Sequence, residues 1–210
     1  GGVVDKSVTG RPMASLIPSG CTWIQQACAS FDPANNSVTL GNGDVVTYDV
    51  LVVAAGIQLD WHEVDGLKEA VGENGVCSNY SFQTVDSTWE NIRNLKKGKA
   101  VFTYPQNPIK CAGAPQKIMW LAEHWFEKQG VRKNIEITYA STTAGIFGIP
   151  RYAATLSQLA AQRDIQTRYQ HDLKAIRADA KQAVFNDMQT GEEVVLDYDM
   201  IHVTPPMSAP

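Results

Sequence analysis

The chain has 210 residues, 44% of them hydrophobic, and a formal net charge of −4 at pH 7. This length suffices to bury a sizeable core in one or two domains. The negative net charge disfavours a nucleic-acid-binding surface. No apolar stretch approaches the ~20 residues of a membrane span, and the first ten residues lack the apolar core of a secretory signal.

The cysteines and histidines show no metal-ligand spacing. Four cysteines, Cys21, Cys28, Cys77 and Cys111, form no CxxC pair and share no spacing with the four histidines. We therefore expect no structural zinc site and assign no histidine a catalytic role. The chain begins without methionine and ends at "VTPPMSAP", which we interpret as the limits of a piece excised from a larger protein.

Residues 21–56 predict a β-meander that feeds a final strand. Asp32-Pro33 marks a turn, and residues 37–48 predict a hairpin around the Gly41–Asp44 turn. "DVLVVAAG", residues 49–56, is a continuous apolar run of the kind that is buried on both faces of a parallel sheet. We interpret Cys21 and Cys28, seven positions apart in the meander, as packing residues.

Residues 57–79 are rich in Gly, Asp and Asn and predict a connection between domains. Cys77 lies there in the polar stretch "NGVCSNYS", and its position leaves two alternatives open, an exposed thiol or a redox partner. The next segment, "SFQTVDSTWENIRNLKKG", predicts a helix that ends at Gly98. Its apolar residues recur at three- and four-residue spacing: Val85, Trp89, Ile92 and Leu95.

From residue 100 onward, strands and helices alternate. A strand at 100–104 precedes a helix at 115–129, and the strand at 134–142 precedes a helix at 151–164. Residues 165–179 predict one strand region, and 182–206 a hairpin followed by a buried strand. The inner stripe of the first of these helices is expected to comprise Ile118, Leu121, Ala122 and Trp125. The alternation predicts an α/β fold with a parallel β-α-β unit.

Cys111 stands in the turn of that unit, within "NPIKCAGAPQKIMWLAEHW". Dinucleotide-binding folds hold a pyrophosphate on a glycine triplet at this place, and here the triplet is missing. The following helix N-terminus favours a thiolate, and Lys110 and Lys117 add positive potential. The position favours a reactive thiol, although a free cysteine is also often a small packing residue.

A second stretch, "YDVLVVAAG", has the small residues at a strand end that let a backbone approach a cofactor closely. By itself the stretch is equally typical of any buried strand before a glycine. Ala55 stands where a threonine is usual in flavoproteins, so a hydroxyl contact there is lost.

Several segments together resemble one family over nearly the whole chain. They are "RPMASLIPSG", "YDVLVVAAGIQLDW", "GVCSNYS", "IKCAGAPQKIMWLAE", "AGIFGIPRYAATL" and "IHVTPPMSAP". The chain is thereby similar to the sulfide:quinone oxidoreductases, particularly the mitochondrial-type branch, within the FAD-dependent pyridine nucleotide-disulfide oxidoreductases. The resemblance implies a Rossmann-like fold with two dinucleotide domains, here partial. Residues 1–80 would be part of the FAD-binding domain, 81–200 the second, NAD-type domain, and 201–210 a return strand toward the FAD domain.

The same resemblance implies the chemistry of Cys111. It would be one of two cysteines that form a disulfide or trisulfide beside the flavin. Sulfide opens the bridge, a persulfide forms, and two electrons pass to FAD and then to quinone, while a small acceptor takes the sulfane sulfur. The second cysteine, the GxGxxG loop and the quinone- and membrane-binding C-terminal part would lie outside this chain.

Cys77 matches a third cysteine of many bacterial members that is not typical of the mitochondrial type. Those members often carry histidines where this chain has Ser81 and Ile146. The resemblance gives the cofactor contacts as Cys28, Ala54, Ala55, Gly56, Pro205 and Pro206. It places the enzyme peripherally on a bacterial or mitochondrial inner membrane, whereas the 210-residue piece itself is expected to be soluble, inactive and without tightly bound FAD.

Three alternatives remain open at this point. Two are related flavoproteins, a sulfide dehydrogenase that uses cytochrome c and an NADH:quinone reductase, the latter disfavoured by the missing glycine triplet. The third is a non-catalytic binding domain with an inert Cys111. Titration of thiols in the folded protein separates the last alternative from the others, because an inert buried thiol reacts only on unfolding.

Overall fold

A computed structural model describes residues 2, 4–106 and 109–210. The chain forms two compact units: a larger one, Gly1–Lys6 with Ile57–Pro210, and a smaller one, Ser7–Gly56. The predicted boundaries at residues 80 and 200 do not coincide with this division, since residues 57–80 and 201–210 belong to the larger unit. The assignment of FAD-type and NAD-type domains stays a prediction.

The smaller unit contains an antiparallel sheet of three strands in the order β1-β2-β3. The strands are β1 (Cys28–Asp32), β2 (Ser37–Leu40) and β3 (Val45–Thr47). Between β1 and β2, the Asp32 side chain accepts a hydrogen bond from the Asn35 backbone N–H at 3.3 Å, and Asn36 adopts a left-handed φ of 48°. The predicted meander and its hairpin are confirmed.

The predicted buried strand at 49–56 is wrong. These residues form no strand, and Val50 and Val52 are each 82% exposed. An apolar run is buried only where other segments cover it and pair with its backbone, and the described residues provide neither. The packing role expected for Cys21 and Cys28 is also wrong, because both are exposed. Cys21 lies outside any strand, and every residue of β1 is exposed.

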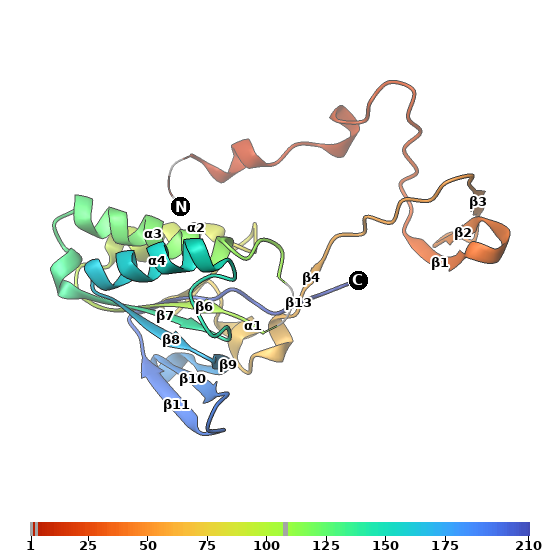
Figure 1. The fold of residues 1–210 in the computed structure, drawn as a ribbon. Coiled ribbons are helices and arrows are strands. Elements are labelled where there is room, and N and C mark those ends of the chain that lie inside the picture. The colour runs from red at the N-terminus through yellow and green to blue at the C-terminus, as the bar shows by residue number, and fades with distance from the viewer. Residues whose placement is uncertain (1, 3, 107–108) are drawn as a thin grey trace. The chain divides into compact units, whose positions relative to one another are not determined.

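The larger unit is built on a parallel sheet of five strands in the order β5-β12-β6-β7-β8. The strands are β5 (Val76–Cys77), β6 (Gly98–Tyr104), β7 (Ile135–Ser141), β8 (Ile165–Tyr169) and β12 (Met200–His202). Helices α2 (Val85–Asn94), α3 (Ala114–Lys128) and α4 (Pro150–Gln162) cover one face of this sheet (Figure 1). The predicted α/β fold and its parallel β-α-β unit are confirmed.

The buried face of α3 differs in part from the predicted stripe. Ile118 and Ala122 are buried as expected, but Met119 and Phe126 complete the stripe, while Leu121 is 44% exposed. The stripe at 118, 119, 122 and 126 follows the helical repeat, so Leu121 falls outside it. Leu121 instead lines an open apolar groove of about 540 Å³ between α3 and α4.

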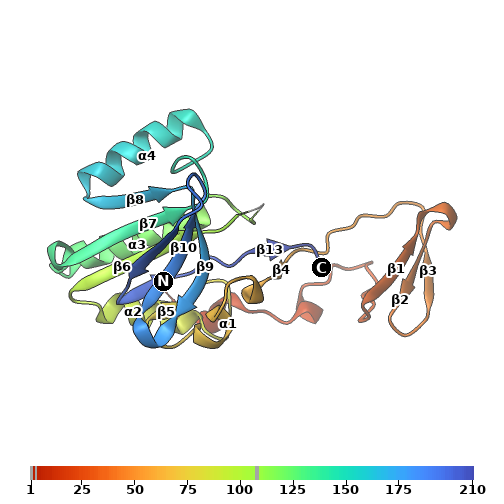
Figure 2. The same ribbon diagram turned by 90° about the horizontal axis from the view of Figure 1, so that it is seen from below.

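The opposite face of the parallel sheet is covered by an antiparallel sheet in the order β11-β10-β9. Its strands are β9 (His171–Arg177), β10 (Gln182–Asp187) and β11 (Glu193–Asp197). Figure 2, the view from below, places β9 and β10 in front of the parallel strands. The predicted hairpin before a buried strand is confirmed. The single strand region predicted at 165–179 is wrong: Gln170, with a φ of 55°, separates β8 from β9, which belong to different sheets.

Short elements complete the larger unit. They are β4 (Gln58–Leu59), which pairs with β13 (Met207–Ser208), and helix α1 (Leu67–Ala70). Short 3-10 turns occur along the chain at Lys6–Thr9, Met13–Ser15, Pro33–Asn35, Trp61–Glu63, Arg132–Asn134 and Ala178–Ala180.

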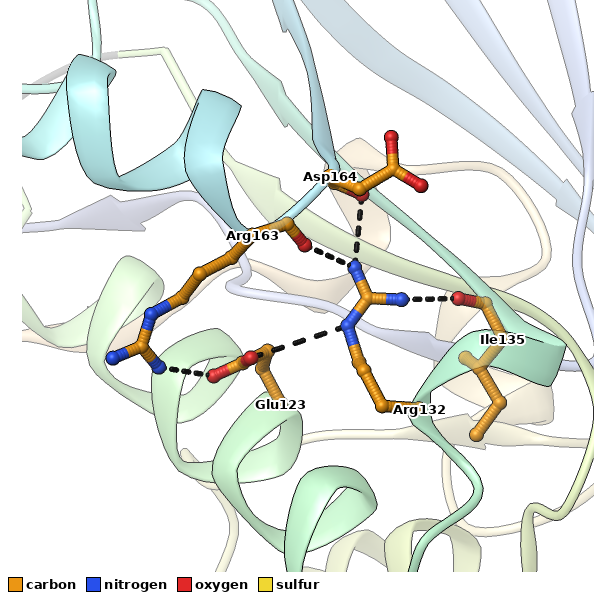
Figure 3. A network of polar contacts seen from close by, with 5 residues as sticks. All are labelled: Glu123, Arg132, Ile135, Arg163 and Asp164. Atoms are coloured by element: carbon orange, nitrogen blue, oxygen red, sulfur yellow. Dashed lines mark hydrogen bonds and ion pairs between the residues drawn. The ribbon is translucent and has the colours of Figure 1, made fainter.

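A buried charge network joins α3 to the segment between α4 and β8 (Figure 3). Glu123 of α3 is 1% exposed, and its carboxylate is 2.5 Å from the Arg163 guanidinium and 4.0 Å from Arg132 Nε. Arg132, 8% exposed, also donates to three backbone carbonyls, those of Ile135, Arg163 and Asp164. The network therefore fixes the amino end of the sheet, away from the carboxyl ends of its strands.

Candidate functional site

Cys111 lies in the connection between β6 and α3, where its side chain is exposed. Its φ of 67° is left-handed, which is uncommon for a residue other than glycine. The Ala114 backbone N–H donates to the Cys111 carbonyl at 3.0 Å, so the chain turns directly into α3. Lys110 and Lys117 are exposed on either side. Cys111 is thus an accessible thiol close to a helix N-terminus, as the sequence predicts.

Two phenols and one threonine hydroxyl belong to the same edge of the sheet as the Cys111 connection. The strands β5, β12 and β6 are parallel neighbours, so their carboxyl ends meet at one edge, where open α/β sheets bind ligands. Tyr80 follows β5, Thr204 follows β12, and Tyr104 ends β6. Burial raises the pKa of Tyr80, the Thr204 hydroxyl lowers it, and negative charge on Cys111 raises it again. Tyr80, Thr204 and Tyr104 therefore lie at the same edge of the sheet, the edge at which the connection that carries Cys111 begins.

The backbone at this edge is held by specific hydrogen bonds. The Ser78 hydroxyl donates to the Val203 carbonyl at 2.7 Å, and the Asn79 N–H donates to Nε2 of His202 at 3.1 Å. Beyond β12, the Thr204 N–H donates to the Thr103 hydroxyl at 3.2 Å. These bonds join the ends of β5, β12 and β6, so the side chains that follow the strands are presented from a fixed frame.

Cys77 is not the polar-loop residue that the sequence predicts. It is fully buried in β5, and its thiol donates to the Ile201 carbonyl at 3.5 Å. Burial raises the pKa of Cys77 to about 12, although the Thr88 hydroxyl lowers it. The two-residue strand pairs with β12 and packs against α2, which removes the thiol from solvent. A buried, protonated thiol is a poor nucleophile. The alternative of an exposed thiol at position 77 is therefore wrong, and a role of Cys77 as a redox partner stays a prediction.

The other predicted contact residues fall into two groups. Pro205 is buried and Pro206 half-buried just after β12, at the same edge as Cys111, and the Asp60 N–H donates to the Pro206 carbonyl at 2.9 Å. The smaller unit contains the rest: Cys28, Ala54, Ala55 and Gly56, all exposed. The structure thus brings Cys111, Pro205 and Pro206 to one edge, and the contacts of all these residues with a cofactor stay predictions.

Sequence reasoning missed Tyr80, Thr204 and His202. Their only signal is position, since each ends or closely follows a strand of the parallel sheet. His202 is fully buried, and burial lowers its pKa to about 3. The imidazole is therefore neutral at physiological pH, with Nε2 accepting the bond from Asn79.

The buried imidazole predicts a loss of stability in acid. Because the pKa of His202 falls from 6.5 to about 3 on folding, the unfolded chain binds the extra proton between these values. The free energy of unfolding should then fall by about 1.4 kcal/mol per pH unit below pH ~6. Urea unfolding between neutral pH and mild acid measures this slope. His202→Gln, which keeps an acceptor for Asn79, should flatten it, whereas His124→Gln on the exposed side of α3 should not. Equal slopes for all three proteins would contradict the assignment.

Two general properties bear on the class of site. Within residues 2, 4–106 and 109–210, no three His, Cys, Asp or Glu side chains are grouped so as to hold a metal ion. None of the helices in the described part of the chain has the length and apolar character needed to span a bilayer.

Comparison with known proteins gives close sequence relatives and a structural neighbour, while no family model matches. The mitochondrial sulfide:quinone oxidoreductase of Mus musculus is 42% identical over 210 residues, covering 100% of this chain and 47% of the relative. Its Dictyostelium discoideum counterpart is 39% identical over 208 residues, covering 99% and 46%. The chain therefore spans about half the length of these relatives. The crystal structure of the Aquifex aeolicus sulfide:quinone oxidoreductase superposes with a TM-score of 0.71 at 20% identity, covering 89% of this chain and 43% of that one.

Proposed function

This chain is homologous along its whole length to the sulfide:quinone oxidoreductases, and from that relationship we propose the activity of the protein that contains it. That protein oxidises hydrogen sulfide to a persulfide or sulfane sulfur, with FAD as redox cofactor and quinone as electron acceptor. The observation that carries the proposal beyond homology is Cys111, an exposed thiol in the turn where a nucleotide-binding domain places its glycines.

Cys111 acts in this proposal as one member of a sulfur bridge. Hydrosulfide attacks a bridge sulfur, the S–S bond breaks, one cysteine keeps the new persulfide, and the other leaves as a thiolate with the bonding electron pair. The partner cysteine lies outside the 210 residues. The exposure of Cys111 gives sulfide access, and Lys110 and Lys117 favour the approach of an anion.

Each of the two units contributes residues that are proposed to contact FAD. Ala54, Ala55 and Gly56 are small and exposed, and a Cβ atom built on Gly56 would meet nothing within 4 Å. In the larger unit, Pro205 and Pro206 supply a rigid backbone at the edge of the sheet to which the Cys111 connection also belongs. When bound, FAD supplies a two-electron acceptor. The proposed setting is peripheral to a bacterial or mitochondrial inner membrane, with a small thiol or other sulfur acceptor as a further partner.

The activity is tested by flavin spectroscopy on a holoprotein that contains this chain. Anaerobic sulfide should bleach the flavin absorbance, and a quinone should restore it. If NADH bleached the flavin and sulfide did not, the NADH:quinone reductase alternative would replace the proposal. If cytochrome c restored the absorbance and quinone did not, the sulfide dehydrogenase alternative would.

We also expect that the 210-residue chain does not bind NADH at the Cys111 turn. A dinucleotide pyrophosphate needs the clearance of closely spaced glycines, and Cys-Ala-Gly-Ala-Pro offers one glycine, Gly113. Calorimetric titration with NADH should show no binding at micromolar concentrations, and the same titration with FAD tests our proposal that this piece alone does not retain the flavin. Micromolar NADH binding that disappears on mutation of the turn would contradict the expectation.

A further inference from the structure

Helices α3 and α4 of the larger unit leave an open groove between them. Its volume is about 540 Å³, a size typical of sites for small molecules, which measure roughly 300–1,000 Å³. The large side chains that line it are Trp120 and Leu121 from α3, Tyr152 and Leu156 from α4, and Phe147 from the loop before α4. Leu121 is 44% exposed and Tyr152 is 57% exposed. Apolar side chains that are gathered and left exposed in a hollow indicate a binding surface.

The buried polar groups that line the groove already have partners within the protein. Gln116, 4% exposed, donates from Nε2 to the Ile146 carbonyl at 3.1 Å, and its Oε1 accepts a hydrogen bond from the indole N–H of Trp120 at 3.2 Å. An apolar ligand can therefore cover both side chains without depriving their polar groups of a hydrogen bond, which is the usual cost of covering a polar surface.

The charge at the groove is positive. Lys117 is the one charged side chain among the described lining residues, it is exposed, and none of the ion pairs between described residues includes it. A second cation is close by, since the Arg163 guanidinium lies 5.9 Å from the centroid of the Trp120 ring. Helix α4, with the sequence PRYAATLSQLAAQ, contains no acidic residue. Apolar walls beside an unpaired cation complement a ligand that has an apolar body and a negatively charged group.

We propose that the α3–α4 groove binds a small, soluble amphipathic anion. The aromatic or aliphatic body of this ligand lies between Leu121, Phe147 and Tyr152, and its anionic group contacts Nζ of Lys117. The proposal is separate from the function proposed above, because this contact requires neither sulfide nor FAD. A neutral ligand of the same shape gains the apolar contacts but not the contact with Lys117, so the test compares two ligands that differ in charge.

The probes are anilinonaphthalene sulfonate, an aromatic anion, and phenylnaphthylamine, its counterpart without the sulfonate. Each is titrated without lipid into a holoprotein that contains this chain, and binding is followed by the increase in dye fluorescence. Lys117→Gln should weaken binding of the anion about fivefold, equivalent to ~1 kcal/mol for one exposed charge pair, and leave the neutral dye unchanged. Leu121→Gln and Tyr152→Ser, one change in each wall, should each weaken both dyes about threefold or more. Both side chains are exposed, so these variants should fold, which circular dichroism checks.

Two control variants separate the groove from other sites. Lys128→Gln removes the same charge from the last turn of α3, outside the groove, and Val52→Gln changes a side chain of the smaller unit that is 82% exposed. Both should bind the two dyes as the wild type does. Weaker binding in Val52→Gln together with wild-type binding in the groove variants would overturn the proposal. Equal effects of Lys117→Gln on the two dyes, or no saturable binding of the anion, would overturn it as well. None of these outcomes depends on whether the protein oxidises sulfide.

Discussion

Cys111→Ser should abolish sulfide-dependent flavin reduction in a holoprotein that contains this chain, while flavin binding is kept. Serine is nearly isosteric with cysteine but cannot enter a sulfur bridge, and its hydroxyl is a poor nucleophile at neutral pH. Loss of a covalent step should lower the rate by at least about a thousandfold, equivalent to ~4 kcal/mol in the activation free energy. Stopped-flow spectroscopy of the flavin after mixing with sulfide measures the rate, and the flavin content of the purified variant checks binding.

Cys77→Ser is the matched control for this experiment. Cys77 is fully buried, and burial raises its pKa to about 12, so its thiol offers little thiolate to sulfide or to a bridge. We expect turnover to fall modestly or not at all. If Cys77→Ser and Cys111→Ser were both inactive, Cys77 would take part in the sulfur bridge, and the similarity to the mitochondrial-type branch would have to be reinterpreted. Full activity of Cys111→Ser would refute the role of this turn as a sulfur site.

The β-α-β unit and the position of Cys111 were predictable because their signals are local. Helices α2, α3 and α4 each carry an apolar stripe within about 15 residues, and Pro115 and Gly130 mark the ends of α3. The accessible Cys111 follows from the same logic, since a small-residue turn between a buried strand and a helix lies at the carboxyl edge of a parallel sheet.

Burial in the smaller unit could not be predicted in this way. The run at 49–56 has the composition of a buried strand, yet Val50 and Val52 are exposed, because composition does not specify which segment covers it. Cys77 shows the opposite error: its polar neighbours predict a loop, and two residues of β5 suffice to bury it. A strand of two residues has no periodicity to detect.

The set of residues at the Cys111 edge of the sheet depends on pairing between strands that are distant in the sequence. Tyr80 and Thr204 are separated by more than 120 positions, and they belong to one edge of the sheet only because the strands they follow, β5 and β12, are neighbours. Nothing in the residues near either position indicates that pairing. Strand order, which places β12 between β5 and β6, is the information that the sequence pattern lacked.

The same dependence on tertiary contacts makes Arg132 a residue whose replacement should strongly destabilise the fold. Its guanidinium donates to the carbonyls of Ile135, Arg163 and Asp164 at 2.6, 2.5 and 2.9 Å (Figure 3). Its Nε lies 4.0 Å from Glu123, whose side chain is 2% exposed. Removing one partner from such a buried arrangement costs about 3–5 kcal/mol, because the remaining charge and carbonyls are left without compensation.

Arg132→Met should therefore lower the free energy of unfolding by about 3–5 kcal/mol, measured by urea denaturation followed by circular dichroism. Arg163→Met is the comparison variant: its side chain is 46% exposed and donates only to Glu123, at 2.5 Å, so its cost should be smaller than that of Arg132→Met, because the three carbonyls keep their donor and Glu123 keeps Arg132 at 4.0 Å. Adding Glu123→Gln to Arg132→Met should recover part of the loss, because the neutral amide removes the uncompensated buried charge, while the three carbonyls still lack their donor. Equal costs for the two arginine variants would show that the carbonyl contacts, which Arg132 alone makes, contribute little to the stability of the fold.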